Sequence, residues 1–92
     1  MTLVRCEIFE GPRSGFKVVK VRSIEGHSEY LTIEDRFLVK QQDDYFLPVG
    51  VIGKDRQQGA VLVQLPVEAD SGANRVWVSK DQLAPKADEI PA

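Results

Sequence analysis

The part of the sequence that most constrains the fold is residues 59–83, where two strand-like apolar runs flank a polar connection. The first run covers residues 60–65, and the second covers residues 75–78 and holds the only tryptophan, Trp77. Two such runs on either side of a polar, glycine-containing segment are typical of a β-hairpin. The sequence therefore predicts a hairpin in the last third of the chain.

The earlier part of the chain also has the period of extended strands. Residues 2–9 alternate between apolar and charged side chains, as expected of a strand with one buried face. Residues 16–24 and 29–33 alternate as well and are separated by a short polar turn, so we expect them to pair as a second hairpin. Residues 45–52 are almost continuously apolar. Because Pro48 cannot donate to a strand ladder, we interpret this segment as a bent strand buried on both faces.

Short strands at close spacing, with turn residues between them, predict an all-β domain of five to seven antiparallel strands, either a small closed barrel or a two-sheet sandwich. Ser79 and Gln82 have the spacing of a capping box, so a single 3-10 turn is expected to bring Leu83 onto the core. Residues 84–92 are rich in proline and charge and are predicted to be a disordered tail. The predicted domain is therefore residues 1–83.

The order of these elements resembles that of the Src-homology-3-like small barrels. The resemblance covers residues 2–83 and depends on the terminal hairpin, whose second strand holds Val76, Trp77 and Val78 and is followed by one helical turn and an apolar residue. It implies a closed small barrel. Peptide-binding members of that group have an Ala-Leu-Tyr-Asp-Tyr segment and two adjacent tryptophans, and this chain has neither. The resemblance therefore implies a shape and no proline-rich-peptide site.

Composition and charge restrict the kind of partner and the cellular compartment. Fourteen acidic residues against twelve basic ones give a net charge of −2, which does not attract a polyanion, so a nucleic-acid partner is not the first expectation. The one cysteine, Cys6, cannot form an intramolecular disulfide, so the cytoplasm is the expected location. No apolar run approaches the ~18 residues of a membrane span, and we expect no membrane association.

Residues that could carry catalysis do not converge in the sequence. Ser71 lies in an Asp-Ser-Gly segment similar to the nucleophile segment of serine hydrolases, but His27 is the only histidine that could act as its base. One histidine and one cysteine cannot assemble a tetrahedral zinc site. Cys6 alternates with apolar neighbours and is predicted to be a buried, inert thiol. We therefore predict no catalytic residue, no metal site and no cofactor, and a protein that is not an enzyme.

The favoured functional hypothesis is a non-catalytic interaction module, in which a protein partner or a second copy is bound through the terminal hairpin. Trp77 is out of phase with its two valine neighbours, so it either points outward or lies under a covering loop. An outward tryptophan with an arginine two residues away is typical of an interaction hot spot. The polar connection can add side chains to it, since loops on a rigid sheet often carry binding groups. The predicted interaction surface contains Trp77, Arg75, Glu68, Asp70 and Asn74.

Two alternative functions depend on charged residues alone. Lys17, Lys20 and Arg22 lie on one predicted strand, and a barrel face carrying them could bind nucleic acid. In the third hypothesis, the carboxylates of Glu68 and Asp70 hold a cation or a small polar ligand. The structural interpretation of the same connection is an ordinary hairpin loop in which a glycine takes positive φ.

Overall fold

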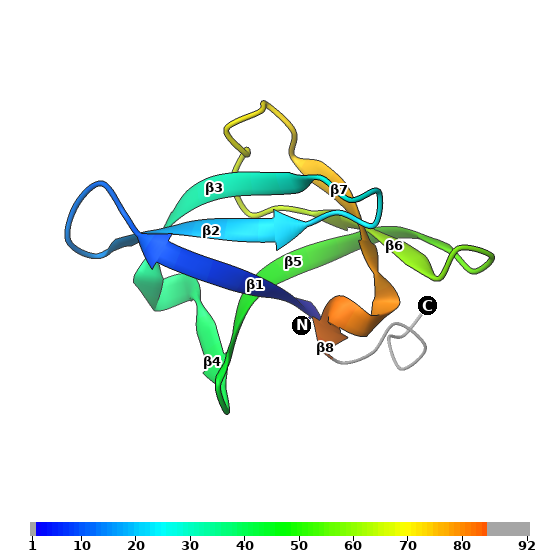
Figure 1. Ribbon diagram of the computed structural model, residues 1–92, viewed down its shortest axis with the longest axis horizontal. Coiled ribbons are helices and arrows are strands. Elements are labelled where there is room, and N and C mark those ends of the chain that lie inside the picture. The colour runs from blue at the N-terminus through cyan, green and yellow to red at the C-terminus, as the bar shows by residue number, and fades with distance from the viewer. Residues whose placement is uncertain (1, 85–92) are drawn as a thin grey trace.

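A computed structural model describes residues 2–84, which form one antiparallel sheet of eight strands and two 3-10 turns. Six strands follow the order β3-β2-β1-β5-β6-β7 and curl into a nearly closed barrel (Figure 1). The elements, in chain order, are β1 (Thr2–Glu10), β2 (Phe16–Arg22), β3 (Ser28–Glu34), η1 (Asp35–Phe37), β4 (Val39–Gln41), β5 (Asp44–Asp55), β6 (Ala60–Gln64), β7 (Arg75–Ser79), η2 (Lys80–Gln82) and β8 (Leu83–Ala84).

The predicted all-β barrel is confirmed, and one continuous sheet forms in place of the two-sheet alternative. Both predicted hairpins are present, as β2 with β3 and as β6 with β7. The strand number exceeds the expected five to seven because β4 and β8 are short additions. Strand β4 follows the bend at η1 and pairs with β5, and β8 follows η2 and pairs with β1.

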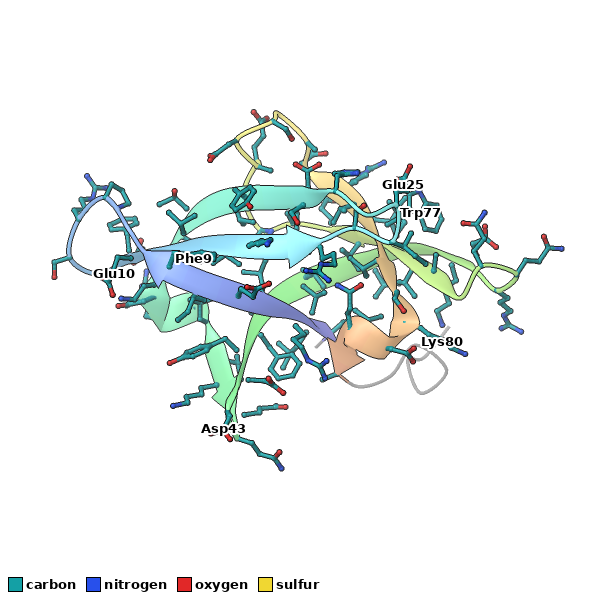
Figure 2. The ribbon with its side chains drawn as sticks, in the orientation of Figure 1. Phe9, Glu10, Glu25, Asp43, Trp77 and Lys80 are labelled. Carbon is teal, nitrogen blue, oxygen red and sulfur yellow. The ribbon has the colours of Figure 1, made fainter. Side chains whose placement is uncertain are left out.

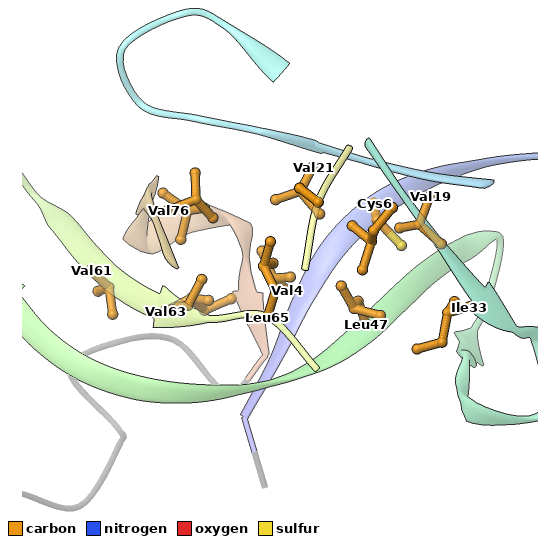
Figure 3. Close-up of a cluster of buried hydrophobic side chains, with 14 residues drawn as sticks. Val4, Cys6, Val19, Val21, Ile33, Leu47, Val61, Val63, Leu65 and Val76 are labelled. Carbon is orange, nitrogen blue, oxygen red and sulfur yellow. The ribbon is translucent and has the colours of Figure 1, made fainter. Parts of the chain in front are cut away.

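Alternation along the strands produces the core. In the terminal hairpin, Val61 faces Val78 and Val63 faces Val76 across the ladder, and all four are at most 4% exposed. Strands β1, β2 and β3 contribute inward residues of the same period, and Figure 3 shows the side chains of both hairpins meeting in one cluster. Since side chains two residues apart share a face of a strand, the inward set follows directly from the sequence.

Strand β5 is the bent strand that its apolar run predicted. It pairs with β1 through its first half, where Pro48 lies opposite Leu3, and with β6 from Gly50 onward. Consecutive side chains in the first half, Phe46 and Leu47, are both buried, but the predicted burial on both faces does not extend to Ile52, which is 45% exposed. The register shifts between Val51 and Gly53, and such a bulge increases the local bend. One strand can therefore belong to both halves of the barrel wall.

No ladder joins β3 to β7 in the described chain; the connection between β6 and β7, residues 65–74, fills this gap instead. Figure 1 shows this connection, in yellow, arching between the two strands. Leu65 and Ala69 are each 4% exposed and pack into the core cluster. The Asp70 amide donates to the carbonyl of Tyr30 in β3 over 2.7 Å. The polar connection is therefore also part of the barrel wall.

The chain leaves β7 through the capping box that the sequence predicted. The Ser79 side chain accepts from the first turn of η2, and the Gln82 side chain accepts from the Ser79 amide over 2.9 Å. Leu83 is 5% exposed and completes the core. Of the predicted tail, Ala84 pairs with Leu3 in β8, and residues 85–92 lie outside the described part of the chain. Among residues 2–84, none of the helical segments has the length and apolar character needed to cross a membrane.

Candidate functional site

Trp77 lies on the outer side of β7 and is half-buried. Its neighbours Val76 and Val78 point into the core and are 4% and 0% exposed, so the predicted outward phase is correct. Leu62 faces it across the ladder, and the amide of Ile24 donates to the Trp77 carbonyl over 2.8 Å. This bond brings the turn between β2 and β3 against β7, and Figure 2 shows the indole beside Glu25 of that turn. Both predicted alternatives hold in part, because the indole points outward and is partly covered.

Arg75 lies two residues before Trp77 on the same outer side of β7. Its side chain is exposed, and it forms no ion pair or hydrogen bond within residues 2–84. A guanidinium without a protein partner keeps all five of its donors for an incoming group. The two predicted hot-spot residues are therefore neighbours on one face of a strand that is held on its other face by the core.

The three predicted residues of the connection, Glu68, Asp70 and Asn74, have exposed side chains. Backbone hydrogen bonds inside the connection fix its course, among them Ala69 N to Ala73 O at 2.7 Å. Gly72 has the positive φ, +92°, that the structural interpretation expected. Within residues 2–84, no group of three or more His, Cys, Asp or Glu side chains is arranged to hold a metal ion. The connection therefore presents separate polar side chains on an ordered backbone.

A buried carboxylate that the sequence analysis missed links this connection to the turn between β2 and β3. Glu29 is 8% exposed, and its Oε1 accepts from the Ser71 hydroxyl over 2.6 Å. Its other oxygen, Oε2, lies 3.2 Å from Nε2 of His27, whose Nδ1 lies 3.1 Å from the Ser23 hydroxyl. The phase of the strand gave a usable signal, because Glu29 is two residues before the buried Leu31 and therefore points inward.

Ser23, His27 and Glu29 contact one another in series and are the residue types of a serine hydrolase triad. Their arrangement does not, however, expose a nucleophile. Ser23 is only 2% exposed, and its hydroxyl already accepts from the Glu25 amide over 3.0 Å. A nucleophile must reach the substrate, and this hydroxyl is enclosed. Ser71, the serine considered from the sequence, donates to Glu29 and not to the histidine. The cluster therefore joins two loops of the barrel.

Cys6 is buried in the core, as its alternation with apolar neighbours predicted. Burial disfavours the thiolate and raises the pKa of the Cys6 thiol from 9.0 to about 12. The thiol lies 3.6 Å from the Tyr45 carbonyl oxygen, which is a suitable weak acceptor. A thiol in this state is a poor nucleophile, because the thiolate is the reactive form.

The three basic residues of the nucleic-acid alternative do not lie together. Lys20 and Arg22 line one groove on the outer side of the barrel, next to Arg5 of β1. Lys17 lies toward the other end of β2, where its Nζ is 3.2 Å from a carboxylate oxygen of Glu10. The sequence analysis missed Arg5, which the pairing of β1 with β5 brings to the same groove.

Comparison with known proteins does not assign this chain to a family. No family model matches the sequence, and no curated protein and no solved structure matches it. The fold and the site therefore define this chain as an all-β, single small barrel with an ordered polar connection in its wall.

Proposed function

We propose that this protein is a non-catalytic interaction module that binds a protein partner or a second copy of itself through the outer face of β7. The observation that carries the proposal is the position of Trp77, half-exposed on a strand fixed by the core, beside Arg75, whose side chain has no partner within residues 2–84. Tryptophan and arginine are the side chains most enriched at interface hot spots. Because the core holds β7 in place, less conformational entropy of the backbone is lost when a partner binds to these two side chains.

The surface we define here as the hairpin surface consists of Trp77, Arg75, Glu68, Asp70 and Asn74. An aromatic side chain of this size removes ~150–250 Å² from water when fully covered, and part of that area is already buried against the barrel in Trp77. The remaining indole surface can anchor a contact of moderate strength, while the exposed polar side chains of the connection form its rim.

The Src-homology-3-like shape and a cytoplasmic location belong to the same proposal. The shape is supported by the β6–β7 hairpin, which is followed by η2 and by Leu83 folding back onto β1. The absence of a disulfide among residues 2–84, which hold a single free cysteine, is compatible with a reducing compartment.

Two measurements test the hairpin surface, one for each kind of partner. Sedimentation velocity over a concentration series should show self-association of the wild type, and Trp77→Ala should abolish it. Ile52→Ala is the control, because it changes an exposed apolar residue on β5 and should leave the self-association unchanged. For a different protein, a photoreactive amino acid at position 75 should give one discrete cross-linked product in cells, whereas the same probe at position 57, in the exposed turn after β5, should not.

Circular dichroism must show that Trp77→Ala is folded. If it is not, Arg75→Glu replaces it, since this exposed residue can be reversed in charge without opening the core. A wild type that is monomeric at every concentration and gives no product from position 75 contradicts the proposal.

A further inference from the structure

A groove of about 370 Å³ lies on the outer side of the barrel, where β1 passes from β8 to β2. Strand β1 pairs with β8 through Leu3 and Val4, and it pairs with β2 only from Glu7 onward. Between these two ladders the strands separate, and this separation accounts for the position of the groove. Its lining consists of Arg5, Cys6, Glu7, Lys20, Arg22, Asp44 and Gln82.

Three cations and two carboxylates surround this groove. Arg22 has an exposed guanidinium with no partner among residues 2–84. The other two cations form long ion pairs, since Arg5 Nε lies 3.8 Å from Asp44 and Lys20 Nζ lies 3.9 Å from Glu7. Charge-assisted hydrogen bonds are about 2.7–2.9 Å long, so neither ion pair is hydrogen-bonded. The donors of all three cations are therefore largely unused.

The frame of the groove is fixed by hydrogen bonds. The Gln82 side-chain nitrogen donates to the Arg22 carbonyl over 3.0 Å, while its oxygen accepts from the Ser79 amide. This residue thus ties η2 to the end of β2 across the groove. On the opposite side, Glu7 and Lys20 face each other in the β1–β2 ladder. A ligand would therefore enter a site whose walls are already placed, which reduces the ordering cost of binding.

We propose that this groove binds a small ligand carrying a phosphate group, with Arg22 and Arg5 donating to the phosphate oxygens and Lys20 adding a third positive charge. Guanidinium groups fit phosphate through paired donors, and a doubly charged group gains more from three cations than a single carboxylate does. The volume is in the range of small-molecule sites. A long polyanion fits less well, because Glu7 and Asp44 place negative charge at the rim.

This site is separate from the hairpin surface in sequence and in the strands that form it. The groove is built from β1, β2, the start of β5 and η2, whereas the hairpin surface belongs to β7 and the connection before it. Binding in the groove can therefore be present or absent whatever the outcome of the association experiments.

The proposal is tested by recording amide NMR shifts of the full chain at constant ionic strength during titration with inorganic phosphate, with adenosine 5′-monophosphate and with a single-stranded decanucleotide. Saturable shifts confined to residues of the groove are expected with phosphate and with the monophosphate. Arg22→Gln should weaken this binding about tenfold, the loss expected for one charge-assisted pair. Arg56→Gln, at an exposed arginine in the turn after β5, is the matched control and should leave binding unchanged.

Glu7→Gln provides a gain-of-binding variant, because it removes a carboxylate from the rim and frees Lys20. It should tighten phosphate binding several-fold, an effect that a purely structural role of these residues would not produce. Tighter binding of the monophosphate than of phosphate identifies an ester as the ligand, and equal binding identifies the free anion. The proposal is overturned if no saturable shift occurs at the groove, if Arg22→Gln binds as the wild type does, or if only the decanucleotide binds. The last result would point to the nucleic-acid alternative.

Discussion

The two halves of the barrel wall are alike on the inside and different on the outside. Strands β1, β2 and β3 and strands β5, β6 and β7 all send alternate apolar side chains into one core (Figure 3). On the outside, the strands of the first half carry charged residues around a groove, which Asp44 of β5 and Gln82 of η2 complete. In the second half, Trp77 is partly covered by a turn from the first. The inner face of a strand thus follows from local alternation, whereas its outer face depends on which distant segments cross it.

The halves are joined at two places. Strand β5 passes from one to the other through its bend, and the connection of residues 65–74 closes the opposite side, between β3 and β7. Variants of this second junction show how far the two halves depend on each other.

The largest effect is expected for Ala69→Asp, which places a carboxylate at a position that is 4% exposed inside the junction. An unpaired buried charge should lower the free energy of unfolding by about 3 kcal/mol or more, or prevent folding. Val67→Asp is the matched control, because Val67 is 40% exposed in the same connection, and its stability should stay within about 0.5 kcal/mol of the wild type. Urea denaturation measures both, and equal stability of the two variants would mean that the halves do not need this closure.

A smaller effect is expected for the contact between Ser71 and Glu29, which ties the connection to β3. Ser71→Ala removes a hydroxyl donor from a buried carboxylate and should lower stability by about 1–2 kcal/mol. Glu29→Ala removes the acceptor and should cost at least as much, and the double variant should cost less than the sum, because the two changes remove one shared interaction. Additive losses in this double-mutant cycle would show that the contact contributes nothing. Ser14→Ala, at an exposed loop position, serves as the control.

The smallest effect at neutral pH, where it is absent, concerns Cys6 of β1, whose thiol is buried in the core. The folded state raises the pKa of this thiol from 9.0 to about 12, so between these values the folded chain keeps a proton that the unfolded chain releases. The contribution is therefore complete below about pH 9 and is lost as the pH rises toward 12. Urea midpoints across this range should fall more steeply for the wild type than for Cys6→Val. Parallel curves for the two proteins would contradict the buried thiol.

Most strands could be predicted from the sequence, because the alternation of apolar and polar side chains is a property of neighbouring residues. The two hairpins, the bent β5 and the Ser79–Gln82 capping box were all predicted from residues close together in the chain. The way in which the barrel closes was not predicted, since it depends on hydrogen bonds between segments far apart, such as Asp70 N to Tyr30 O. Strand β8 was missed for a related reason: its two residues are too few to show a period.

For the candidate sites, too, the local features could be predicted and the contacts between distant segments could not. The outward phase of Trp77 was available from its two valine neighbours, but its partial cover comes from a turn some fifty residues earlier, which no local pattern indicates. The groove combines Arg5 with Lys20 and Arg22 only because β1 pairs with β5 and with β2 in different parts of its length. The inward position of Glu29 was readable from strand phase, but its hydrogen bond to Ser71 was not.

The connection between β6 and β7 looks in the sequence like the natural place to insert a label or a tag, because it is long, polar and contains glycine. Its buried Ala69 and its bond to β3 mean that added residues there would separate the barrel at its seam. The tight turn at residues 56–59 is the better choice, because residues 56–58 are exposed and contact mainly the preceding Asp55. A fluorophore or an epitope placed in that turn would leave the barrel closed and the groove accessible.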